Sequence, residues 1–93
     1  MAVTVRIPTP LRAYTDRQAA VSVDGTTVAE VLAALTTRHP DLAQHLRGAD
    51  GRLRSFVNVY LGDEDIRFLD REATPVSAGD ELTIVPSIAG GAP

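Results

Sequence analysis

One well-marked helix constrains the fold of this 93-residue chain more than any other feature of its sequence. Thr27 and Glu30 have the spacing of a capping box, in which each side chain accepts a hydrogen bond from a backbone N–H at the helix start. The apolar residues that follow fall on one helical face: Val28, Val31, Leu32 and Leu35. Pro40 disfavours helical geometry in the residue before it, so the helix should end near Arg38 or His39.

Segments with the alternating or β-branched composition of strands lie on both sides of this helix. They are residues 3–7, 21–23, 56–60, 66–68 and 82–85. Turns that contain glycine close several of them. The order strand, strand, helix, strand, short strand, strand predicts an α+β fold, in which one main helix packs on one face of a mixed sheet.

The last residues of the chain differ in character from this predicted domain. Pro86 cannot donate a ladder hydrogen bond, so the final strand should stop there. We therefore expect a folded domain over residues 1–86 and a flexible tail over residues 87–93 that contains Gly90 and Gly91. Because glycine has no Cβ atom, such a pair can lie extended in a channel too narrow for other residues. A glycine pair alone is equally typical of a frayed terminus.

Charge and cysteine content argue against several classes of function. The net charge of -3 and the absence of a basic run disfavour nucleic-acid binding. The chain has no cysteine, so any sulfur chemistry must take place at its terminus and not on a side chain. No apolar stretch approaches the roughly 20 residues that span a bilayer, so we expect no membrane association and a cytoplasmic location.

No site for a metal or a bound cofactor is predicted. His39 and His45 are six residues apart, which does not place them on one helical face. The acidic run 63–65 lacks the ligand spacing of a calcium loop and is expected to form a solvated turn. Ser55 and Ser77 have no recognisable Ser-His-Asp context, so no catalytic triad is predicted.

Four segments make the chain resemble the β-grasp sulfur-carrier family, which includes the thiamin sulfur carrier and the small subunit of molybdopterin synthase. They are residues 56–60 (FVNVY), 63–68 (DEDIRF), 79–81 (GDE) and 86–91 (PSIAGG). The first two are most like the carriers of an actinobacterial cysteine pathway. The resemblance covers nearly the whole chain and implies a ubiquitin-like β-grasp fold.

The resemblance also implies a function as a protein co-substrate and not as an enzyme. An E1-like enzyme would use ATP to adenylate the carboxylate of Gly91, and a sulfur donor would convert the acyl-adenylate to a thiocarboxylate. A sulfur-accepting biosynthetic enzyme would then take the sulfur. The tail would enter the partner's active site through Ser87, Ile88, Ala89, Gly90 and Gly91. The final sulfur acceptor and the sulfur donor are not evident from the sequence.

Ala92 and Pro93 depart from the Gly-Gly end that the family usually has. A proline ring should not fit a channel shaped for glycine. Since some relatives carry short extensions that a metal-dependent protease removes, the resemblance implies a precursor that trimming to Gly91 activates. A foreign extension and a loss of function are the alternatives.

Strand alternation predicts where a partner would contact the domain. If Val57, Val59, Leu82 and Ile84 face the helix, the side chains between them face outward. The predicted partner-binding face therefore contains Phe56, Asn58, Tyr60, Thr83 and Val85. The alternative is that Phe56 and Tyr60 fold over an edge of the sheet for packing alone.

Two other functions are compatible with the same fold. In a ubiquitin-like modifier, the activated carboxyl group is transferred to a lysine amine, which leaves a stable isopeptide conjugate. In a noncatalytic β-grasp binding module, the tail has no chemistry and could be deleted without loss of function.

Overall fold

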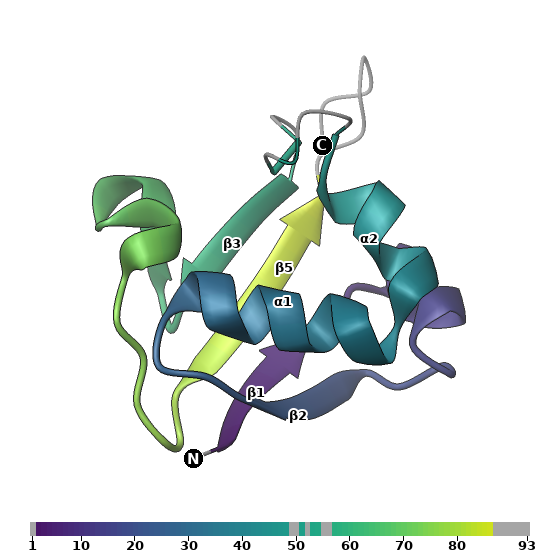
Figure 1. The fold of residues 1–93 in the computed structure, drawn as a ribbon, viewed down its shortest axis with the longest axis horizontal. Coiled ribbons are helices and arrows are strands. Elements are labelled where there is room, and N and C mark those ends of the chain that lie inside the picture. The colour runs from purple at the N-terminus through teal and green to yellow at the C-terminus, as the bar shows by residue number, and fades with distance from the viewer. Residues whose placement is uncertain (1, 49–50, 52, 55–56, 87–93) are drawn as a thin grey trace.

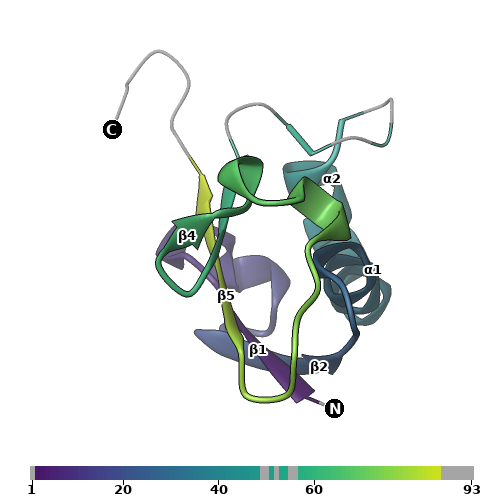
Figure 2. The ribbon, with the colours of Figure 1, turned by 90° about the vertical axis from the view of Figure 1, so that its left-hand side faces the viewer.

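A computed structural model describes residues 2–48, 51, 53–54 and 57–86 of the chain. Their strands form one mixed, five-stranded sheet, and the helices α1 and α2 lie on the same face of it (Figures 1 and 2). This arrangement confirms the predicted α+β class. Within these residues, no helix has both the length and the apolar character needed to cross a membrane.

The strands follow the order β2-β1-β5-β3-β4 across the sheet. Their bounds are Ala2–Arg6 for β1, Ala20–Asp24 for β2, Val57–Leu61 for β3, Glu64–Asp65 for β4 and Glu81–Pro86 for β5. β1 pairs antiparallel with β2 and parallel with β5, whereas β3 pairs antiparallel with both β5 and β4. The first and last strands of the domain are therefore neighbours inside the sheet.

The opening hairpin has the register that its alternating pattern predicts. Val3 lies opposite Val23 and Val5 lies opposite Val21, and all four side chains are buried. The connection between these strands contains a 3₁₀ helix, η1 (Thr9–Tyr14), which the sequence analysis did not predict. Its one buried apolar side chain joins the core.

The main helix α1 spans Val28–Arg38 and confirms the predicted start and end. The Thr27 hydroxyl oxygen accepts a hydrogen bond from the backbone N–H of Glu30 at 3.2 Å. The Glu30 carboxylate accepts bonds in return from the N–H and the hydroxyl of Thr26, the residue before the N-cap, at 2.8 and 2.9 Å. The bond from the Thr26 backbone, followed by that from its hydroxyl, lowers the pKa of Glu30.

The segment after β3 folds differently from the prediction. A strand was expected over residues 66–68, and one turn of 3₁₀ helix, η2, lies there instead. The short strand β4 comes earlier, because Gly62 has a φ of +60° and its tight turn returns the chain at once to the end of β3. The Asp65 carboxylate then accepts the backbone N–H of Arg67 at 2.9 Å and so caps η2. The expectation of a solvated turn at residues 63–65 is wrong for Asp65, which is 7% exposed.

The core fills the space between the sheet and the two helices. The four side chains predicted to face inward from β3 and β5 are all buried: Val57, Val59, Leu82 and Ile84. Helix α1 contributes the predicted stripe of Val28, Val31, Leu32 and Leu35. The shorter helix α2 (Pro40–Leu46) contributes Leu42 and Leu46. Figure 2 shows the sheet nearly edge-on with both helices to one side of it.

We predict that Leu32→Ala lowers the free energy of unfolding by about 2–4 kcal/mol, because this side chain is 1% exposed and its loss leaves a cavity. Thr37→Ala, on the exposed side of the same helix, should change it by less than about 0.5 kcal/mol. Urea denaturation of the parent and both variants measures the difference. An unchanged stability of Leu32→Ala would show that the buried face of α1 is assigned wrongly.

Candidate partner-binding face and the end of strand β5

The tail predicted to carry the chemistry leaves the domain from an inner strand. β5 is paired on one side with β1 and on the other with β3, and its last residue, Pro86, lies opposite Val57. Figure 1 shows this end of β5 at the opposite end of the sheet from the amino terminus. The predicted tail residues Ser87, Ile88, Ala89, Gly90 and Gly91, and the extension Ala92 and Pro93, lie outside the described residues.

The predicted partner-binding face lies on the side of the sheet away from the helices. Asn58 is opposite Val85, and Tyr60 is opposite Thr83, so these four side chains form two adjacent cross-strand pairs. Val85 is 38% exposed, and the other three are half-buried. The structure therefore brings together four of the five residues proposed for this face. The fifth, Phe56, lies outside the described residues.

Asn58 carries an incompletely satisfied polar group at this face. Its side-chain oxygen is buried and makes no hydrogen bond to any described part of the protein. A buried acceptor without a donor is unfavourable by about 1–3 kcal/mol, so a donor supplied from outside the chain would be favoured here. Asn58 therefore carries an unused hydrogen-bond acceptor at its predicted position.

An ion pair that the sequence analysis did not identify borders the same face. Asp65 lies opposite Tyr60 in the sheet, and its carboxylate accepts hydrogen bonds from the side chain of Arg67, the shortest at 3.0 Å. The bonds from the Arg67 side chain, followed by the bond from its backbone N–H, lower the pKa of Asp65. Those side-chain bonds also raise the pKa of Arg67. The acidic-x-basic spacing at residues 65 and 67 was the available signal in the sequence.

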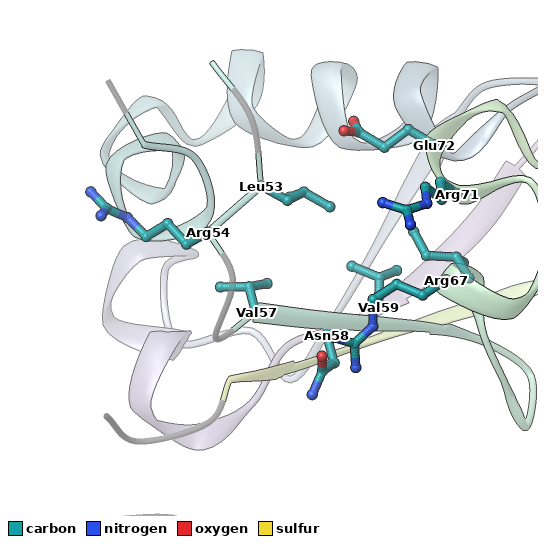
Figure 3. A pocket seen from close by; sticks show the side chains of 9 residues that line it. Leu53, Arg54, Val57, Asn58, Val59, Arg67, Arg71 and Glu72 are labelled. Atoms are coloured by element: carbon teal, nitrogen blue, oxygen red, sulfur yellow. The ribbon is translucent and has the colours of Figure 1, made fainter. Parts of the chain in front are cut away.

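A cavity of about 520 Å³ lies along β3, next to η2 and the short 3₁₀ helix η3 (Arg71–Ala73). Figure 3 shows Leu53 directed into it above Val57 and Val59, with charged side chains at the opposite end. The residues that supply those charges are Arg67, Arg71 and Glu72. Nothing in the sequence pattern predicts this cavity, because it depends on how the irregular segment after β3 folds back beside that strand.

The two histidines do not converge on a common site. The ring of His45 stacks on Tyr14, with the ring centroids 4.1 Å apart and the planes inclined by 28°. His39 lies at the junction of α1 and α2. Among the described residues, no group of three or more His, Cys, Asp or Glu side chains is arranged to hold a metal ion.

A comparison with models of protein families matches the ThiS family over residues 5–91. The match covers almost the whole chain and reaches the second glycine of the pair. The chain belongs to the ThiS family. The family resemblance inferred from the sequence is thereby confirmed.

Individual members and neighbours of the ThiS family agree with this assignment. The sulfur carrier protein CysO of Mycobacterium tuberculosis (strain H37Rv) is 42% identical over 93 residues, covering 98% of this chain and 100% of that protein. A chain in the crystal structure of the Amycolatopsis orientalis BexX/CysO complex superimposes with a TM-score of 0.88 at 42% identity, covering 97% of this chain and 100% of that chain. The crystal structure of SAMP1 from Haloferax volcanii gives a TM-score of 0.85 at 29% identity, with coverage of 98% and 100%. These similarities confirm the predicted ubiquitin-like β-grasp fold.

The lowered pKa of Asp65 predicts how the stability of the fold depends on pH. Because the folded-state pKa of Asp65 is lowered, its carboxylate stabilises the fold above the unfolded-state pKa of about 3.9, and this stabilisation is lost as the pH falls through the folded-state value. Asp65→Asn should therefore be less stable than the parent by a constant amount above about pH 5 and by a shrinking amount toward about pH 3.

Urea denaturation at several pH values measures the stability of Asp65→Asn relative to the parent. Asp63→Asn is the matched control, since Asp63 is exposed on the same turn, and it should stay close to the parent throughout. A stability difference for Asp65→Asn that does not vary with pH would contradict the role assigned to the ion pair.

Proposed function

We propose that this chain is a protein sulfur carrier whose reactive group is the carboxylate of Gly91. An oxygen of that carboxylate attacks the α-phosphorus of ATP on an E1-like enzyme, and pyrophosphate leaves. A sulfide equivalent from a sulfur donor then attacks the acyl carbon. The bond between that carbon and the phosphate oxygen breaks, and AMP leaves. The resulting thiocarboxylate gives its sulfur to a biosynthetic enzyme, for which the similarity to CysO favours a role in cysteine biosynthesis.

The observation that carries this proposal is the extent of the family match. It continues through Gly91, which lies beyond the last described residue of β5, and it leaves out Ala92 and Pro93. The pairing of β5 on both sides supports the same reading, because the tail then starts from a fixed point on the domain. Removal of Ala92 and Pro93, by a metalloprotease in our proposal, would expose the carboxylate of Gly91.

The dimensions of the tail suit delivery into a channel. The five residues from Ser87 to Gly91 extend at most ~17 Å at roughly 3.3 to 3.6 Å per residue. Ordering each of them costs about 1–2 kcal/mol of backbone entropy, so the tail alone should bind weakly. The outward face of β3 and β5 would supply the remaining affinity, through Phe56, Asn58, Tyr60 and Val85.

The chain acts in this proposal as a co-substrate and not as an enzyme. It has no cysteine, so no side chain can carry a persulfide, and the carboxyl terminus is the remaining place for sulfur. The ATP belongs to the activating enzyme, and the carrier itself binds no cofactor.

A ubiquitin-like modifier is the second candidate, and the similarity to SAMP1, a small archaeal modifier protein, favours it. The activated Gly91 would then acylate a lysine amine on another protein. Because the chain contains no lysine, it could not be conjugated to itself through a side-chain amine. A stable isopeptide-linked conjugate on other proteins would distinguish this function from sulfur transfer.

We expect that removal of Ala92 and Pro93 makes the chain competent for thiolation. With ATP, a competent E1-like enzyme and a sulfur donor, the chain that ends at Gly91 should gain about 16 Da, the mass difference between sulfur and oxygen. The chain with Ala92 and Pro93 should not change. Intact-protein mass spectrometry reads both forms, and Gly90→Val in the trimmed chain is a control that adds a β-branched side chain in the proposed channel.

Equal thiolation of the trimmed and untrimmed chains would contradict the precursor proposal. Failure of both with an enzyme that is active on another carrier would contradict the sulfur-carrier proposal itself.

The outward face gives a separate prediction. Tyr60→Asp combined with Val85→Asp should weaken binding to the E1-like enzyme by about tenfold or more, because both side chains would be desolvated in the complex. Ser22→Asp, at an exposed position of the edge strand β2, should leave the affinity unchanged. Titration calorimetry measures the three affinities, and thermal melting checks that each variant is folded. An unaltered affinity of the double variant would place the contact elsewhere.

A further inference from the structure

Arg71 places an unpaired cation at the cavity beside β3. Its side chain makes no hydrogen bond or ion pair with any described residue, and in Figure 3 it points toward the cavity. The neighbouring charges are already matched. Glu72 pairs with Arg47 at 2.6 Å, and Arg67 pairs with Asp65 at 3.0 Å. Among the described residues, the positive charge of Arg71 is therefore left without a counter-charge.

The backbone of Arg71 is strained in a way that its side chain does not explain. Its φ of +54° lies in the left-handed region, which glycine adopts most easily. The turn is closed by a bond from the Thr74 N–H to the Arg71 carbonyl at 3.1 Å, which any residue could accept. A non-glycine residue held in such a conformation is more common at ligand clamps than elsewhere.

Two exposed apolar side chains come directly after Arg67, one of the residues that line the cavity. Phe68 follows Arg67 in η2 and is 83% exposed, and Leu69 is 38% exposed. Inside the cavity, Leu53, Val57 and Val59 form apolar walls. A small molecule held within the cavity would leave Phe68 in water, whereas a protein surface lying across the cavity would cover both.

We propose that this cavity and Phe68 form a docking site for a partner protein that inserts an acidic side chain flanked by apolar ones. The carboxylate accepts hydrogen bonds from the Arg71 guanidinium, while its apolar neighbours pack against Leu53, Val59 and Phe68. An arginine with a nearby aromatic side chain is typical of residues that dominate binding energy at interfaces. The site does not depend on the tail chemistry proposed above, because it lies on the folded domain and needs no activated carboxyl group.

The test uses a Leu-Glu-Leu tripeptide with both ends blocked, titrated into the isotope-labelled full chain and followed in amide NMR spectra. We expect saturable shifts concentrated on the cavity-lining segments of β3, η2 and η3. The blocked Leu-Gln-Leu tripeptide, which has the same shape without the charge, should bind about tenfold more weakly, as expected for the loss of a charge-assisted hydrogen bond.

Two glycine variants separate binding from stability. Arg71→Gly removes the cation and the backbone strain together, so it should raise the melting temperature and weaken Leu-Glu-Leu binding by about tenfold. Arg17→Gly is the matched control: Arg17 has a φ of +64° and does not line the cavity. It should also raise the melting temperature while leaving peptide binding unchanged.

Equal binding of Leu-Glu-Leu to Arg71→Gly and to the parent would overturn the proposal, and so would shifts that lie away from the cavity. Free 4-methylpentanoate is the remaining probe. If it binds as tightly as the peptide and Phe68→Ala has no effect on either, the cavity takes small organic acids and the docking site is wrong. A threefold or greater loss of peptide binding in Phe68→Ala, about that expected for a lost apolar contact, supports it.

Discussion

The parallel pairing of β1 with β5 is the interaction on which the rest of the structure depends. It joins residues 4–6, near the start of the domain, to residues 81–83, near its end. The half-exposed ion pair between Arg6 and Glu81, at 3.1 Å, lies across these two strands. Every helix and the other three strands lie within the loop that this pairing closes. Because β5 runs in the same direction as β1, its carboxyl end emerges far from the amino terminus (Figure 1).

This geometry separates two proposed roles, partner binding by the folded domain and chemistry at the carboxyl terminus. The inward side chains of β3 and β5 are buried in the core, which leaves their outward side chains available for contact on the other face of the sheet. The unsatisfied oxygen of Asn58 and the exposed Val85 lie on that outer face, close to the last strand residue, Pro86. A partner that binds this face would also contact the end of β5, where the tail begins. The tail of residues 87–91 is expected to have a weak affinity of its own for the partner's channel. That affinity would suffice once the partner is held on the outer face.

The sequence was informative wherever a repeating pattern decided the structure. The period-two alternation of Val3 and Val5 and the helical spacing of Val31 and Leu32 each led to the observed burial, because hydrophobic periodicity reflects which side faces the core. Local geometry was harder to predict. The tight turn at Gly62 places the short strand at residues 64–65, and a 3₁₀ helix lies at residues 66–68, where the strand was expected.

The candidate site was predictable only in part, and for a related reason. Alternation placed Asn58 and Tyr60 on one face correctly, since their direction follows from the phase of the strand. The cavity could not be predicted, because it depends on where η2 and η3 lie beside β3 and on the positive φ of Arg71. Such features arise from irregular turns and short 3₁₀ helices, which leave no periodic signal in the sequence.

The central claim is that a folded domain presents the carboxylate of Gly91 for activation. ATP–pyrophosphate exchange catalysed by an E1-like enzyme tests it most directly, since exchange reports reversible formation of the acyl-adenylate. The account predicts exchange with the chain that ends at Gly91, and none with the chain that retains Ala92 and Pro93 or with an isolated peptide of residues 82–91. Absence of exchange with the trimmed chain, under conditions in which the enzyme activates another carrier, would contradict it, as would equal exchange with the isolated peptide.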